Sequence, residues 1–196
     1  MKKIILILTI LIVFLALSVI LEQKFNQPNK EFSDVGLENQ TYFAKENKEK
    51  KMKLTTVFEH NKNIPSIYTC DGEDLAPELT ISDVPANAKE LVLIVDDPDA
   101  PMGTWVHWLV YNIPANTTKI DAKNLPQGSK QGITDFGRIG WGGPCPPSGT
   151  HRYFFKLYAI DEALELKEGL TKSQLEHAIK GHVIEQDELI GLYKRT

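Results

Sequence analysis

Residues 95–113 read VDDPDAPMGTWVHWLVYNI and join an acidic, proline-containing segment to an aromatic strand pattern. The run Leu91 to Val95, which leads into this stretch, is wholly apolar, as in a buried strand. Proline lacks a backbone donor and restricts the residue before it, so the acidic segment cannot lie inside a helix or a strand. We therefore expect a loop between two strands, and such loops commonly carry binding sites.

Residues 142–158, GGPCPPSGTHRYFFKLY, repeat the arrangement of a proline- and glycine-rich turn followed by an aromatic strand. His107 stands at the start of the first aromatic strand and His151 at the start of the second. Trp105 and Tyr153 each lie two residues from one of these histidines, and alternate residues of a strand share a face. The pattern predicts a small concave site with imidazole donors and aromatic walls, suited to a phosphoryl group or another small anion.

Three acidic residues precede the first histidine. Asp96 and Asp97 are adjacent at the end of a buried strand, so their side chains point to opposite faces. The side chain that faces inward needs hydrogen-bond donors and is placed to orient an imidazole. Asp99 is more simply explained as a turn former, because aspartate accepts hydrogen bonds from nearby backbone N–H groups.

The remainder of the chain predicts a β-rich fold. Short β-forming segments lie at residues 54–59, 79–81 and 189–193, and a longer aromatic one, RYFFKLYAI, lies at 152–160. Five or six short strands separated by turn residues are typical of a sandwich or a barrel.

One helix is expected near the C-terminus. Thr171 and Gln174 have the spacing of a capping box, in which each satisfies a backbone donor at the helix start. Leu175, Ala178 and Ile179 then form an apolar face at helical spacing, and Gly181 can end the helix.

Three segments of different composition follow one another along the chain. In residues 1–21, two lysines precede an uncharged apolar stretch whose length lies between those of a signal peptide and a membrane span. Residues 22–53 are polar without periodicity and predict a flexible tether, and residues 54–196 form the folded domain. We expect either a membrane anchor with the domain on the extracytoplasmic side, or a cleaved signal that leaves the domain secreted or periplasmic.

The folded domain is acidic. Residues 54–196 hold 20 acidic and 13 basic side chains, a net charge of −7, and the whole chain has a net charge of −4. Binding to a phosphate backbone needs a basic surface, so nucleic acid is not expected as a partner. No HxxxH, HExxH or CxxC spacing supports a metal site, and no cofactor is predicted. No GxSxG motif or activated cysteine supports covalent catalysis, and no catalytic residue is assigned.

Cys70 and Cys145 are the only two cysteines in the chain. In an exported domain they fall in a compartment that permits disulfides. A bridge between them would close a loop of about 75 residues and contribute roughly 4.5 kcal/mol in the chain-entropy account. Two free, half-buried thiols are the equally weighted alternative.

The pairing of DPDAP and WxHW with GGPCPPSGTHRY resembles the phosphatidylethanolamine-binding protein (PEBP) family, in its bacterial and archaeal Raf-kinase-inhibitor-like branch. The resemblance covers about residues 54–195, including IYTCDGEDLAPEL at 67–79 and GHVIEQDELIGLYKR at 181–195. It implies a mainly β sandwich with a large antiparallel sheet, a smaller sheet and a few peripheral helices. It also implies an anion pocket built from Asp97, Pro101, Trp105, His107, Pro147, His151 and Tyr153. Asp99 and Arg152 match motif positions that look structural, as an internal pair.

The resulting expectation is an exported, membrane-tethered and non-catalytic protein that binds a small anion or a phosphorylated headgroup. Asp97 would orient one imidazole and favour its protonated form, so anion affinity should rise below about pH 6.5. One alternative is an inhibitor of a protease or kinase that acts through surface loops on an unknown protein partner. A less favoured alternative is a hydrolase that uses Asp97 and the two histidines.

Overall fold

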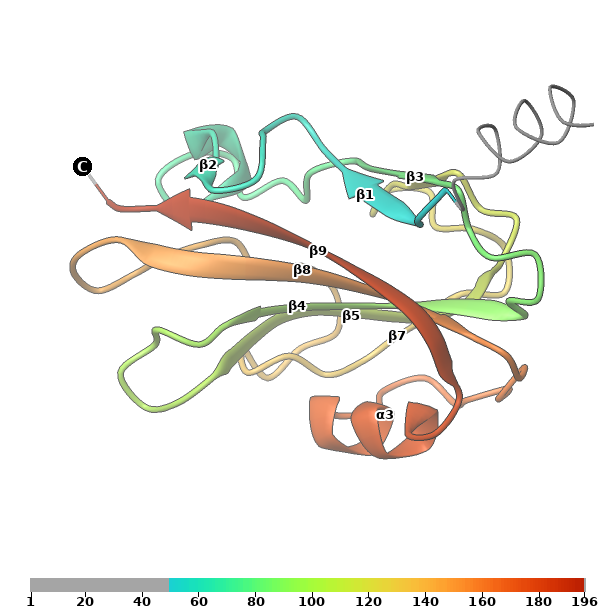
Figure 1. Cartoon of the computed structure of the whole chain (residues 1–196). Helices are drawn as coiled ribbons and strands as arrows, with labels where there is room; N and C mark the ends of the chain where they lie inside the picture. The colour runs from blue at the N-terminus through green and yellow to red at the C-terminus, as the bar shows by residue number, and fades with distance from the viewer. Residues whose placement is uncertain (1–49, 196) are drawn as a thin grey trace, which may run out of the picture. The chain divides into compact units, whose positions relative to one another are not determined.

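The computed structural model describes residues 50–195, which fold into two β-sheets and one α-helix (Figure 1). The large sheet has six strands in the order β2-β9-β8-β4-β5-β7, and the small sheet has three in the order β1-β3-β6. Neighbouring strands are antiparallel except β2 and β9, which are parallel. The elements in chain order are β1 (Lys53–Thr55), β2 (Lys62–Asn63), η1 (Ser66–Tyr68), β3 (Leu79–Ser82), β4 (Glu90–Asp97), β5 (Trp105–Pro114), β6 (Lys119–Ile120), β7 (Lys130–Gln131), β8 (His151–Ile160), α3 (Lys172–Ile179) and β9 (Val183–Tyr193).

Strand β4 lies at the centre of the large sheet and is buried on both faces. Its apolar run therefore shows no alternation, as the sequence indicated. Leu91, Leu93 and Val95 face the small sheet, whereas Val92 and Ile94 face the helix. The strand continues two residues past the apolar run and ends at Asp97, directly before Pro98.

Two hydrophobic clusters cover the two faces of the large sheet. The cluster on one face fills the space between the sheets, where Leu54, Leu79 and Ile120 of the small sheet meet Phe155 and Leu157 of β8. The cluster on the opposite face packs Leu175 and Ile179 of α3 against Val92, Ile94 and Leu109. Figure 1 shows the small sheet and the helix on opposite sides of the large sheet.

Helix α3 begins where the capping box predicted. The Thr171 side chain accepts a hydrogen bond from the Gln174 backbone N–H, and the Gln174 side chain accepts one from the Thr171 backbone N–H. Gly181 follows the helix at a φ of 90°, a left-handed conformation that glycine adopts without strain. The prediction of a mainly β fold with two sheets and a helix near the C-terminus is confirmed.

The strand inventory differs from the expectation in detail. The structure has nine strands in residues 50–195 rather than five or six, because β2, β6 and β7 are only two residues long and leave no periodic pattern. Strand β9 begins at Val183, six residues before the expected start at Leu189. Its first half is partly exposed on both faces, so its residues do not alternate between apolar and polar.

The membrane anchor expected from the sequence is not supported by the structure. No helix within residues 50–195 is long and apolar enough to cross a membrane. The anchor or signal expected at residues 1–21, and nearly all of the tether expected at residues 22–53, lie outside the described residues. The structure therefore gives no support to a membrane-anchored protein with its domain on the extracytoplasmic side.

Candidate functional site

A cavity of about 340 Å³ opens where β4 ends and where β5 and β8 begin. It contains all seven residues proposed for the site from the sequence. Its lining comprises Asp97, Ala100, Pro101, Met102, Trp105, His107, Phe136, Cys145, Pro146, Pro147, His151 and Tyr153. The structure thus brings the two motifs to one place, and their role in binding an anion stays a prediction.

Antiparallel pairing explains why the two motifs meet. The end of β4 pairs with the start of β5, where Asp97 lies opposite Trp105. On its other edge, β4 pairs with the start of β8, where Asp96 lies opposite Phe154. A register shift between Val95 and Asp96 marks an irregularity in the β4–β5 ladder at this point, and such bulges often redirect side chains beside a site.

Asp97 and His151 form a buried pair on the cavity wall. His151 Nδ1 donates a hydrogen bond to Asp97 Oδ2 at 2.7 Å, and each side chain is less than one tenth exposed. The other carboxylate oxygen of Asp97 accepts from the backbone N–H of Asp99 at 2.8 Å. Both oxygens of Asp97 are therefore used, and its charge lies beside the His151 ring.

His107 is held by a backbone carbonyl instead of a carboxylate. Its Nδ1 donates to the Gly142 oxygen at 2.5 Å, and the Gly142 N–H donates to the His107 carbonyl at 3.0 Å. The imidazole makes edge-on contacts with Phe136 and Tyr153, with ring centroids 5.4 and 5.1 Å apart. Burial lowers the pKa of His107, although the Gly142 hydrogen bond and the Asp97 charge act in the opposite direction.

Tyr153 places a hydroxyl group in the same wall. The side chain is buried, and its hydroxyl proton has no acceptor among residues 50–195. Burial and the nearby Asp97 charge raise the pKa of Tyr153 far above its usual range, so the hydroxyl stays protonated. It is available as a donor to a bound group.

Two of the acidic residues near the first motif lie outside the cavity lining. Asp99 accepts from Arg152 Nε at 2.9 Å and from Arg152 Nη2 at 2.7 Å, which forms a two-point ion pair. Asp96 is fully buried on the helix-facing side of the sheet, where Lys156 Nζ lies 2.8 Å and Lys172 Nζ 3.5 Å from its oxygens. Of the two adjacent acids, Asp97 is the one that faces the cavity.

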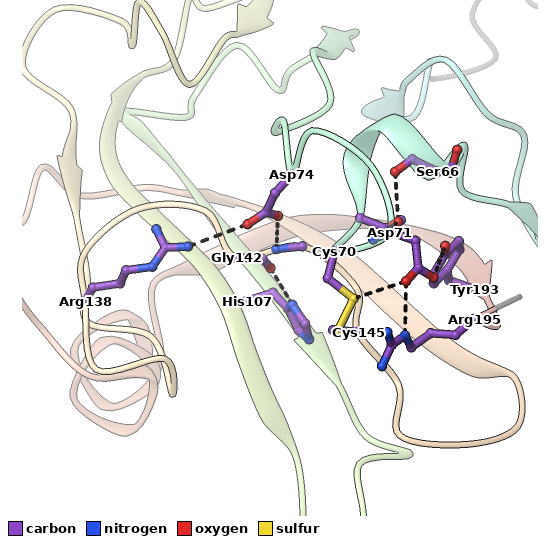
Figure 2. The surroundings of a disulfide bond; sticks show 12 residues. Ser66, Cys70, Asp71, Asp74, His107, Arg138, Gly142, Cys145, Tyr193 and Arg195 are labelled. Carbon is purple, nitrogen blue, oxygen red and sulfur yellow. Dashed lines mark hydrogen bonds and ion pairs between the residues drawn. A yellow bond between two sulfur atoms is a disulfide. The ribbon is translucent and has the colours of Figure 1, made fainter.

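Cys70 and Cys145 form a disulfide at the edge of the cavity (Figure 2). Their Cα atoms are 5.4 Å apart, and Cys145 is itself part of the cavity lining. The backbone N–H of Cys70 also donates to the Pro144 carbonyl at 3.1 Å. The bridge therefore ties the loop after η1 to the proline-rich segment that forms one cavity wall.

Five lining residues were not proposed from the sequence. Ala100, Met102 and Pro146 lie inside or beside the two motifs, so their positions in the sequence could have indicated that they line the cavity. Cys145 was proposed from the sequence as a possible disulfide partner of Cys70, and not as a cavity residue. Phe136 comes from the loop after β7, and no local pattern there marks it as a cavity residue. No group of three or more metal-ligating side chains occurs in the part of the chain that the structure describes.

Comparison with known proteins identifies the family. The family model described as phosphatidylethanolamine-binding protein matches residues 54–194. A UPF0098 protein of Methanothermobacter thermautotrophicus is 51% identical over 146 residues, which are 72% of this chain and 97% of the relative. A UPF0098 protein of Aquifex aeolicus is 49% identical over 145 residues, which are 70% of this chain and 85% of the relative.

Two solved structures share the fold. A PEBP homologue of Chlamydia trachomatis superposes with a TM-score of 0.71 at 42% identity and covers 74% of this chain and 99% of its own. YbcL of Escherichia coli, a member of the mammalian PEBP family, superposes with a TM-score of 0.70 at 30% identity and covers 75% of this chain and 100% of its own. With its fold, its two motifs and its family match in agreement, this chain belongs to the phosphatidylethanolamine-binding protein family.

Proposed function

We propose that this protein is a non-catalytic binding protein whose cavity takes a phosphoryl or carboxyl anion, of the kind carried by a phospholipid headgroup. The observation that supports this most is the set of polar atoms left without partners around one cavity. Within residues 50–195, the hydrogen bonds of the His107 and His151 rings are made at Nδ1, which leaves Nε2 of each ring for a ligand, and the Tyr153 hydroxyl proton has no acceptor. Three such groups around one small space suit an oxygen-rich ligand.

The hydrogen bonds at Nδ1 decide how the two rings can act. A carbonyl and a carboxylate can only accept, so Nδ1 of each ring carries a proton. A neutral ring then presents Nε2 as an acceptor, and it can donate to an anion only after taking up a second proton. We therefore expect anion binding to be coupled to proton uptake, or to favour a ligand that brings its own proton.

The two histidines are not equivalent in this respect. A positive charge on the His151 ring is offset directly by Asp97. At His107 the partner is a neutral carbonyl, and burial lowers the pKa of the ring. In the proposed complex, His151 donates a hydrogen bond to the anion with Asp97 as counter-charge, and Tyr153 donates a neutral one. His107 donates a charged bond only at acidic pH, because burial lowers its pKa.

The remaining walls are largely apolar. Pro101, Trp105, Phe136 and Pro147 surround the polar end of the cavity, and Met102 is 95% exposed at its rim. A cavity of about 340 Å³ has the size of sites for small organic molecules and is larger than a bare phosphate needs. The ligand we expect is therefore an anion attached to an organic group, and the family description, phosphatidylethanolamine-binding protein, agrees with that class.

Titration of the full chain with inorganic phosphate and with phosphoethanolamine tests the proposal. Calorimetry at pH 5.5 and pH 8, in buffers of different ionisation enthalpy, gives both affinity and proton uptake. We expect tighter binding at pH 5.5, net proton uptake at pH 8, and loss of binding in His151→Ala. Glu162→Gln, which neutralises an exposed acid outside the cavity lining, is the matched control.

Two results would contradict the proposal. Equal affinity for the anion at pH 5.5 and pH 8 would show that protonation of the histidines does not contribute to binding. Hydrolysis of a phosphoester, abolished by His151→Ala, would replace a binding protein with an enzyme.

A further inference from the structure

A single peptide group connects the His107 ring to a carboxylate on another loop. The carbonyl of Gly142 accepts from His107 Nδ1 at 2.5 Å, and the N–H of Gly143, in the same peptide unit, donates to Asp74 Oδ1 at 2.6 Å. Figure 2 shows Asp74 and His107 on opposite sides of this peptide. The C=O and N–H of a trans peptide point in opposite directions, so one peptide unit can serve both partners.

We propose that Asp74 is a positioning residue for the anion site, and that it acts on His107 through the Gly142–Gly143 peptide. Hydrogen bonds in a chain polarise one another, so a carboxylate on the N–H side makes the carbonyl oxygen a stronger acceptor. A stronger acceptor holds the Nδ1–H tautomer and the plane of the His107 ring, and it stabilises a second proton on Nε2. His151 receives this help directly from Asp97, and His107 receives it through one peptide.

The residues around the Gly142–Gly143 peptide hold it close to Asp74. Gly142 and Gly143 are buried. A Cβ on Gly143 would collide with the Asp74 carboxylate and the Tyr68 carbonyl, so only glycine lets the two segments approach this closely. The Cys70–Cys145 disulfide joins the same two segments a few residues away, as Figure 2 shows.

The charges around His107 are few, which makes the contribution of Asp74 measurable. Asp97, Asp96 and Asp74 all favour a charged ring, and burial opposes it. Three aromatic side chains, those of Phe136, Trp141 and Tyr153, also lie beside the ring, and they carry no charge. Arg138 Nη2 lies 3.8 Å from Asp74 Oδ2, but both side chains are more than two fifths exposed, so this ion pair is screened by solvent.

Nitrogen-15 NMR of the His107 ring in the full chain tests the inference without any ligand. The variants are Asp74→Asn, which keeps an acceptor oxygen for Gly143 but removes the charge, and Asp74→Ala, which removes both. Glu73→Gln is the matched control, because it neutralises an exposed acid on the same loop. Ring shifts recorded from pH 5 to pH 8 report tautomer and proton affinity, and His151 serves as the internal reference.

We expect the proton affinity of His107 to fall on the order of three- to tenfold in Asp74→Asn, with the His151 ring and the rest of the spectrum unchanged. Asp74→Ala should in addition populate the Nε2–H tautomer. The inference is overturned if His107 titrates in Asp74→Asn as it does in Glu73→Gln while the fold is intact.

A second measurement rests on the proposed function. Inorganic phosphate should bind Asp74→Asn at pH 5.5 about threefold or more weakly than it binds the wild-type chain. Unchanged phosphate affinity in Asp74→Asn would overturn the role of Asp74 in binding. A wild-type chain that binds no phosphate would overturn the proposed function. The NMR titration of the His107 ring needs no ligand, so it tests the effect of Asp74 on His107 independently of that result.

Discussion

Asp97 and His151 are paired by a 2.7 Å hydrogen bond between the end of one strand and the start of its neighbour, and both side chains are buried. A buried carboxylate needs a partner, and a buried imidazolium needs a counter-charge. His151 supplies the donor that the Asp97 carboxylate needs, and Asp97 supplies the negative charge that a protonated His151 ring would need. The carboxylate of Asp97 therefore has a buried donor, and the His151 ring is fixed with Nδ1 toward Asp97.

Asp97→Asn should weaken phosphate binding at pH 5.5 by about tenfold. Asparagine removes the charge that stabilises an imidazolium, and its single oxygen can accept from His151 Nδ1 or from the Asp99 N–H but not from both. One such charged hydrogen bond is worth roughly 1.5–3 kcal/mol. Calorimetry on the variant and on the control Glu162→Gln measures the difference. Unchanged affinity in Asp97→Asn would show that the charge of Asp97 is not used in binding.

The free energy of unfolding should decrease as the pH is lowered, because of His107. Burial lowers the pKa of His107 in the folded protein below its unfolded value of about 6.5. Below pH 6.5 the His107 side chain is protonated in the unfolded chain and still neutral in the folded chain. The contribution of His107 to the free energy of unfolding is therefore complete above pH 6.5 and is lost as the pH falls toward the pKa of the folded state. Urea unfolding from pH 7.5 to pH 5 measures the slope.

The matched variant for this slope is His107→Asn, whose amide keeps a donor for the Gly142 oxygen but does not titrate. Its stability should decline less than that of the wild type over the same range. Saturating phosphate should reduce the wild-type decline if a bound anion stabilises the charged ring. Parallel slopes in variant and wild type would assign the decline to other groups.

The Asp99–Arg152 pair should stabilise the protein except in strong acid. The Arg152 side chain lowers the pKa of Asp99 to about 2, because its guanidinium donates to the carboxylate at two points. The folded pKa is depressed, so the contribution is present above pH 4 and is lost as pH falls through about 2. Asp99→Asn should cost about 1 kcal/mol at pH 7, a small value because Arg152 is half exposed.

Denaturant unfolding of Asp99→Asn and wild type at pH 7 and pH 2 checks this expectation. The difference between the two proteins should be present at pH 7 and largely gone at pH 2. A difference that stays constant with pH would point to a change in packing.

The buried Asp96 should make Lys156 important for stability. Asp96 is fully buried, and Lys156 supplies its two shortest hydrogen bonds, at 2.8 and 3.0 Å. Lys156→Met leaves the carboxylate with Lys172 at 3.5 Å and should cost about 3 kcal/mol, as breaking a buried pair does. Urea unfolding gives the value, and Lys180→Met, at an exposed lysine after α3, is the control.

A double variant separates charge from packing at this position. Adding Asp96→Asn to Lys156→Met removes the unpaired charge and should recover part of the lost stability. No recovery would show that the cost came from losing the Lys156 ammonium group from its place over the Phe154 ring, 5.3 Å from the ring centroid.

The parts of the fold that were predictable from the sequence are those in which burial leaves a pattern. Strand β4 reads as an unbroken apolar run because both of its faces are covered, and α3 carries a complete capping box and an apolar face. The half-exposed start of β9 and the two-residue strands carry no such pattern. Their places are decided by pairing with strands that are distant in the sequence.

In the candidate site, too, the predictable residues are those that belong to a local sequence pattern. His107 and His151 could be proposed together because each begins an aromatic strand beside a proline-rich turn. Phe136, and the contact of Asp74 with Gly143, depend on loops that meet only in the folded chain. The bond between Asp74 and Gly143 spans 69 residues, and nothing in the residues around Asp74 indicates what it contacts.

The bridge between Cys70 and Cys145 has a consequence for chain integrity. It joins two cysteines 75 positions apart and so closes a covalent ring that contains β3, β4, β5, β6 and β7. A protease that cuts one exposed bond inside that ring, for example near Lys123 or Asn124, produces two polypeptides that remain joined through sulfur. The nicked molecule keeps both halves of its cavity until a thiol reductant reaches the exposed bridge.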